Sequence, residues 1–156
     1  MTIKAIATQS DRIYLGDLSE EVEELEGECP QDERAWVTVR QATAGDFRRV
    51  GNSSGPRKTQ WLEGVRTDVW NDDWAEAWAM QSYCCLTGTG NIEDGDGKPL
   101  FTFESQIDYD KVKMSFDTFL EKHDSLPKAV TNAIRTAVWS INPDWDLLAT
   151  DEGEAD

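Results

Sequence analysis

A run of oxygen-bearing side chains lies at residues 91–97, which read Asn-Ile-Glu-Asp-Gly-Asp-Gly. Such a run suits calcium, which helix–loop–helix loops bind through side chains at positions 1, 3 and 5, with glycine at position 6. If Gly97 is position 6, position 1 is Ile92, which has no ligating atom. If Asp94 is position 1, position 6 is Pro99. Neither register fits, so the segment is predicted to be a hairpin turn, and no metal is predicted.

Three cysteines and one histidine are the other candidates for site chemistry. Cys84 and Cys85 lack the two-residue gap that tetrahedral zinc sites usually need, and Cys29 is distant in the sequence. The adjacent pair is predicted to consist of small apolar residues at the buried end of a helix. His123 is the only candidate base for a nucleophile, and it is predicted to lie on the surface at a helix junction. The chain is therefore predicted not to be an enzyme and to need no cofactor.

The acidic charge of the chain is unevenly distributed. The net charge is −16 at pH 7, yet residues 17–33 hold nine acidic side chains and residues 144–156 hold six, without a base in either run. Such runs are typically flexible and solvated, or they neutralise basic side chains elsewhere in the chain, here those of residues 34–66. Alternatively, they face a basic partner. Phosphate repulsion disfavours nucleic acid as a partner, unless the following side chains form an isolated patch: Arg48, Arg49, Arg57 and Lys58.

The length of 156 residues matches one domain. We expect a single globular domain over residues 1–143, with an acidic insertion at about 17–33 and an acidic tail at 144–156. No run of 18 apolar residues exists, so no membrane-spanning helix is predicted. The first residues lack a basic start and a cleavage site, which predicts no signal peptide and a soluble, intracellular protein.

Helical periodicity is clearest near the C-terminus. Apolar residues recur on one helical face: Leu126, Val130, Ala133, Ile134, Ala137, Val138 and Ile141. Ser125 is the expected cap of this helix, and Asn142 with Pro143 ends it. Shorter helices are predicted at 18–26, 43–50 and 114–122.

Three tryptophans recur every four residues at Trp70, Trp74 and Trp78. This spacing predicts a long amphipathic helix from Asp68 to Leu86, ended by the glycines of residues 87–90. Two interpretations of the stripe stay open. The tryptophans fill the core of a small domain, or part of the stripe is exposed and docks a protein partner, since tryptophan is favoured in interface hot spots.

Short strands are predicted at 2–8, 12–15, 36–40 and 100–103, with a loop at 51–56. Together with the helices they predict an α+β fold, a single small domain with a few short strands, three or four helices and flexible acidic segments.

Several of these motifs resemble small proteins encoded among the tail genes of long-tailed bacteriophages, and the closest named group is the phage tail assembly chaperones. The resemblance spans roughly residues 36–145 and is carried by residues 37–46, 91–101 and 114–116, and by the helix from Leu126-Pro127 to Asn142-Pro143-Asp144-Trp145. It implies a non-enzymatic morphogenesis protein that binds tail proteins, the tape measure or tail tube protein, in the host cytoplasm during assembly. It transfers no catalytic residue.

The expected partner-binding residues are the tryptophan stripe and the apolar face of the last helix: Trp70, Trp74, Trp78, Val130, Ile134 and Val138. Two alternatives stay open. The first is a structural virion protein at the neck or tail, which contacts neighbouring virion subunits. The second is an acidic inhibitor of a host protein that mimics DNA, which requires acidic side chains on a folded surface. The sequence makes no prediction of the oligomeric state.

Overall fold

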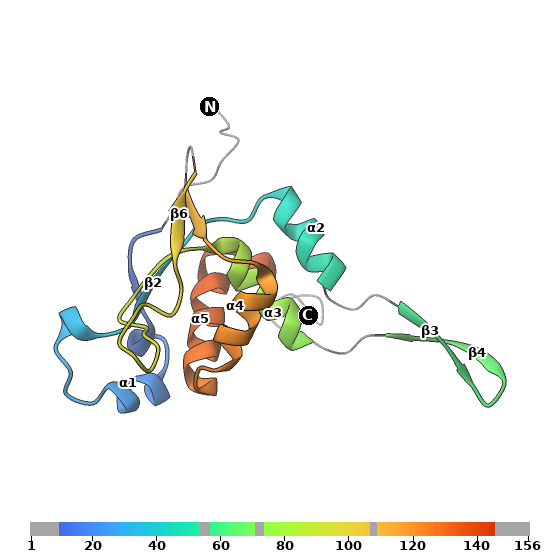
Figure 1. Ribbon diagram of the computed structural model, residues 1–156, viewed down its shortest axis with the longest axis horizontal. Helices are drawn as coiled ribbons and strands as arrows, with labels where there is room; N and C mark the ends of the chain where they lie inside the picture. Colours follow the sequence, from blue (N-terminus) through green and yellow to red (C-terminus); the bar gives the residue numbers. More distant parts are fainter. Residues whose placement is uncertain (1–9, 54–56, 71–73, 107–108, 146–156) are drawn as a thin grey trace, which may run out of the picture.

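The computed structural model describes residues 10–53, 57–70, 74–106 and 109–145, and for 52, 53, 57–62, 66–70 and 74 it describes the backbone alone. This part of the chain contains five α-helices and three small antiparallel sheets (Figure 1). The predicted α+β class is confirmed. None of the helices in these ranges is long and apolar enough to cross a membrane. The predicted strand at 2–8 and the acidic tail beyond Trp145 lie outside the described residues.

A three-stranded sheet joins segments that are far apart in the sequence. Its order is β1-β2-β5, with β1 (Ile13–Tyr14), β2 (Trp36–Val39) and β5 (Leu86–Gly90) all antiparallel. The prediction that residues 87–90 only end a helix is wrong, because they form β5. Gly90 is required there, since the indole of Trp36 fills the space that a Cβ would occupy.

The predicted tryptophan helix is also wrong over its first third. Residues 57–70 form an antiparallel hairpin of β3 (Arg57–Leu62) and β4 (Val65–Trp70), and α3 (Trp74–Cys85) begins only after it. Glu63 and Gly64 both have positive φ, 54° and 81°, as a two-residue hairpin turn requires. The β-branched residues of β4 favour a strand. Trp70 therefore lies on a strand, and the four-residue spacing of the tryptophans is not a helical stripe.

The helix α5 (Lys128–Ile141) carries the predicted apolar face into the core, beside α3 (Figure 1). Four of its residues are buried: Ala133, Ile134, Ala137 and Val138. Asn142 ends the helix as predicted. Ser125 does not cap α5; it ends α4 (Phe116–Asp124), and its hydroxyl donates to the carbonyl oxygen of Lys122.

The first acidic run is partly helical rather than flexible throughout. It contains α1 (Glu20–Glu26), flanked by the 3₁₀ turns Leu15–Asp17 and Gln31–Glu33. Ser19 begins α1 by accepting a hydrogen bond from the amide of Val22, and Gly27 ends it with φ of 60°. Val22 is 2% exposed. Burial of this one apolar residue anchors a helix whose other side chains are mostly charged.

The remaining elements match the predictions only in part: the strand predicted at 100–103 begins only at Phe103, and the strand at 110–112 was not predicted. The helix α2 (Ala44–Ser53) extends into part of the predicted loop, and residues 54–56 lie outside the described residues. The turn at 94–99 is confirmed: Oδ1 of Asp94 accepts from the amides of Asp96 and Lys98. It leads to the hairpin of β6 (Phe103–Ser105) and β7 (Asp110–Val112). A 3₁₀ turn at Pro143–Trp145 follows α5.

Candidate functional site

The structure separates the residues that were expected to bind a partner. Trp70 and Trp74 lie on β4 and at the start of α3, and their side chains are outside the description. Ile134 and Val138 have no exposed surface, so they are core residues and not a contact surface. Trp78 and Val130 are partly exposed, and each lines a different hollow.

The larger of these two hollows, about 290 Å³, lies between α1, residues 91–93 and the chain that enters α5. We call it the acidic groove. Its apolar lining comes mainly from Val22, Leu25, Ile92, Leu126 and Val130, and its carboxylates are those of Glu26, Glu33 and Glu93. Among the described residues, no basic side chain lines it. Apolar surface edged only by carboxylates suits a partner segment with an apolar face and basic residues.

Leu25 is the most exposed apolar residue of this lining. Its side chain is 63% exposed, although Val22, three positions earlier on α1, is buried. Exposed apolar side chains are common singly, but one that borders an apolar hollow adds to a contiguous patch. Leu25 lies within the helix predicted at 18–26, but it is not among the residues that were expected to bind a partner.

Hydrogen bonds hold the wall of the acidic groove in place. Oε2 of Glu26 accepts from the amide of Ala35 at 2.7 Å, which ties α1 to the start of β2. Gly16 leaves room for this carboxylate, because a Cβ at that position would lie 2.8 Å from Oε1 of Glu26. Nδ2 of Asn91 donates to the carbonyl oxygens of Asp32 and Arg34. These bonds fix α1 and residue 91 against the chain that leads into β2 without help from a ligand.

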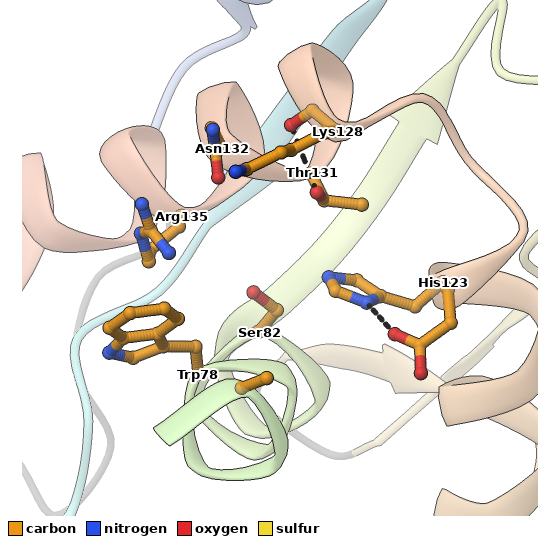
Figure 2. Close-up of a pocket in the computed structure, with 9 residues that line it drawn as sticks. Trp78, Ser82, His123, Lys128, Thr131, Asn132 and Arg135 are labelled. Atoms are coloured by element: carbon orange, nitrogen blue, oxygen red, sulfur yellow. Dashed lines mark hydrogen bonds and ion pairs between the residues drawn. The ribbon is translucent and has the colours of Figure 1, made fainter. Parts of the chain in front are cut away.

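The second hollow, about 190 Å³, lies between α3 and α5 and is closed by the end of α4 (Figure 2). We call it the cationic cleft. Its residues come from all three helices: Ala75, Trp78 and Ser82; His123 and Asp124; Lys128, Thr131, Asn132 and Arg135. On α5 the four residues recur at helical spacing, so that they share one face.

Aromatic and cationic groups pack into one wall of this cleft. The guanidinium carbon of Arg135 lies 4.0 Å from the centre of the Trp78 ring and 5.1 Å from that of Trp139. The two indoles meet edge to face with ring centres 6.3 Å apart. Nε1 of Trp139 donates to Oε1 of Gln81 at 2.8 Å. The wall therefore has a defined geometry before any ligand arrives.

His123 is not the surface residue that was predicted. It is 9% exposed, because its ring packs on Phe119 with ring centres 5.7 Å apart. Nδ1 lies 3.1 Å from Oδ1 of Asp124, and Nε2 points toward the cleft (Figure 2). Ser82, His123 and Asp124 are the residue types of a hydrolytic triad. Within the described residues, however, no hydrogen bond joins Ser82 to His123.

The adjacent cysteines are buried, as predicted, where α3 meets β5. Burial raises the pKa of Cys84 to about 11 and that of Cys85 further still. Both thiols are therefore protonated at neutral pH and unreactive. In the described ranges, no three histidine, cysteine or acidic side chains converge to hold a metal ion.

A buried ion pair connects the helices and the strand that surround these cysteines. Arg40, at the end of β2, donates to both carboxylate oxygens of Asp46, at 2.7 and 3.3 Å, and to the carbonyl oxygen of Cys84 at 2.6 Å. Asp46 also accepts from the amide of Thr43, whose hydroxyl accepts from the amide of Asp46. The pair thus links β2, the start of α2 and the end of α3. It is structural rather than part of either hollow.

Comparisons of the chain with protein families, with curated proteins and with solved structures found no match.

Proposed function

We propose that this protein is a non-enzymatic assembly protein of bacteriophage tails, similar to the tail assembly chaperones, and that it acts by binding another protein. The observation that carries the proposal is the acidic groove. It offers apolar side chains in a hollow where α1 is hydrogen-bonded to the start of β2, and the charged groups that line it, among the residues the structure describes, are all carboxylates. These features support protein binding rather than catalysis.

The chemistry of the groove specifies the partner segment. Val22, Leu25 and Val130 offer apolar contact, whereas Glu33 and Glu93 attract lysine or arginine. The matching segment is an amphipathic helix or strand of a tail protein, the tape measure or tail tube protein, with basic residues beside its apolar face. Repulsion between chains of net charge −16 keeps such a complex dispersed. We place this binding in the host cytoplasm during assembly.

One observation favours a second candidate, the acidic inhibitor that mimics DNA. The first turns of α1 hold four exposed glutamates on a folded helix: Glu20, Glu21, Glu23 and Glu24. A fixed row of carboxylates is what a mimic of the phosphate backbone requires. This candidate needs the glutamates and not Leu25, so the two functions separate by mutation.

The proposal is tested by counting copies of the chain in purified virions and in the infected-cell lysate, with quantitative mass spectrometry. An assembly chaperone is expected in the lysate and absent from virions. Stoichiometric copies in the virion would contradict the chaperone and support the structural protein at the neck or tail, in contact with neighbouring virion subunits. Recovery from the lysate with a host nucleic-acid-binding protein, and without tail proteins, would support the inhibitor.

A further inference from the structure

We propose that the cationic cleft is a binding site for a compact oxyanion, a phosphate or carboxylate group. This site is separate from the acidic groove and does not depend on the proposed function. It rests on the charge of the cleft, on polar groups inside it that lack partners, and on the rigidity of its walls.

The charge of the cleft opposes that of the chain as a whole. The net charge of the protein is −16, yet Lys128 and Arg135 both line this hollow, and Asp124 is the one acidic residue among the described residues of its lining. Lys128 forms no ion pair with any residue that the structure describes. It also lies in the first turn of α5, where the helix dipole adds positive potential. An anion is therefore attracted to the mouth of the cleft.

Two polar side chains inside the cleft have no hydrogen-bond partner among the described residues. Ser82 is 1% exposed, and its hydroxyl makes no hydrogen bond to that part of the chain. The side-chain amide of Asn132 is likewise without a partner there. Figure 2 places both at the cleft, on facing helices. The Ser82 hydroxyl and the Asn132 amide are therefore available to donate hydrogen bonds to a ligand in the cleft.

The walls of the cleft are held by contacts that do not involve a ligand. Arg135 lies over Trp78, and Trp78 packs against Trp139. Asp124 orients the His123 ring so that Nε2 is directed inward. Side chains that are already ordered bind an anion with a smaller entropic cost.

The size and shape of the cleft favour a compact group. A volume of about 190 Å³ accepts a phosphate or carboxylate but is small for a drug-sized molecule. Arg135 covers one face of Trp78, which leaves that face unavailable for stacking a nucleobase. The oxyanion comes either from free or esterified phosphate or from an acidic side chain of a protein.

The test uses the single histidine of the chain as a reporter. The full chain is titrated with inorganic phosphate, and separately with acetate, at constant pH and ionic strength, while the His123 ring protons are followed by NMR. A saturable shift of the His123 signals is expected with at least one of the anions. Tighter binding of phosphate indicates a phosphate ligand, whereas tighter binding of acetate indicates an acidic side chain of a protein. The absence of a saturable shift with both anions would overturn the proposal.

Two substitutions that remove the same charge distinguish binding at the cleft from a general effect of the protein's net charge on anion binding. Lys128→Met is expected to weaken binding by about tenfold, the loss typical of one charge-assisted hydrogen bond. Lys128→Arg retains most of the affinity. Lys113→Met is the matched control, because Lys113 is exposed and does not line the cleft, and it should bind as the wild type does. Equal weakening by Lys128→Met and Lys113→Met would overturn the site.

Discussion

The Asp46→Ala variant is expected to lose about 3–5 kcal/mol of unfolding free energy, the usual result of removing one partner from a buried ion pair. Arg40 is 4% exposed, and its charge is compensated mainly by Asp46. Without the carboxylate, the guanidinium stays buried with only carbonyl oxygens to accept its hydrogen bonds. The start of α2 also loses the bond from the amide of Thr43. Urea denaturation followed by circular dichroism measures the loss.

A neutralised surface carboxylate is the control for this variant. Asp96→Ala changes the charge equally at an exposed turn, and its effect should stay within about 0.5 kcal/mol. Replacing both partners, as Arg40→Met with Asp46→Leu, should recover much of the loss, because no uncompensated charge remains. If Asp46→Ala lowers the free energy of unfolding by less than about 1 kcal/mol, the ion pair does not stabilise the fold as the structure implies.

The same pair makes stability depend on pH. Burial alone would raise the pKa of Asp46, but the hydrogen bonds from Arg40 and Thr43 outweigh it and lower the pKa below its ordinary value. The folded state therefore binds this proton less readily than the unfolded state does. The stabilisation is complete above about pH 4 and is lost as pH falls through the folded pKa. Asp46→Ala should show a weaker loss of stability with acid than the wild type.

If the acidic groove docks a tail protein as proposed, the Leu25→Glu variant is expected to bind that protein about 30-fold more weakly or worse, the loss of roughly 2 kcal/mol that defines an interface hot spot. It removes the most exposed apolar side chain of the acidic groove and places a further carboxylate beside Glu26 and Glu33. Stability should change by no more than about 0.5 kcal/mol, because Leu25 is largely exposed. Recovery of tail proteins on tagged chain from infected cells measures the binding.

Val65→Glu is the matched control for Leu25→Glu. Val65 is 64% exposed and lies beside the β3–β4 turn, whereas Leu25 is 63% exposed and lines the groove. Val65→Glu should therefore retain binding. Glutamine at Glu20, Glu21 and Glu24 removes carboxylates of α1 that do not line the groove, and it should also leave tail proteins bound. Docking in the groove would be contradicted if the Leu25→Glu variant recovered its partner as the wild type does while the glutamine variant lost it. That result would support the DNA mimic.

The fold was predictable from the sequence where one pattern had no competitor. The apolar face of α5 and its end at Asn142 followed from a 3.6-residue period sustained over four turns. The helix predicted from the tryptophans was wrong over its first third because two sequence patterns overlapped there. The tryptophan spacing matched a helix, but the β-branched residues of β4 and the Glu63-Gly64 turn favoured a hairpin, which the structure adopts.

The candidate site was less predictable than the fold. The acidic groove joins Leu25, Ile92 and Val130, which lie on three segments far apart in the sequence, and no local pattern marks them as neighbours. The last helix was expected to expose its apolar face, but tertiary packing covers Ile134 and Val138 and leaves Val130 partly exposed. His123 was placed on the surface, although its contact with Phe119, four residues earlier on α4, is local. The burial of this face of α4 depends on its packing against α3, which the sequence alone does not show.

Hydrogen–deuterium exchange of the chain, free and bound to the tail protein with which it is recovered, tests the central claim most directly. If the acidic groove is the docking surface, binding should slow amide exchange in α1 and at residues 91–93, and exchange in the β6–β7 hairpin should not change. Protection confined to the β3–β4 hairpin or to the α3–α5 cleft, with α1 and residues 91–93 unaffected, would contradict the account.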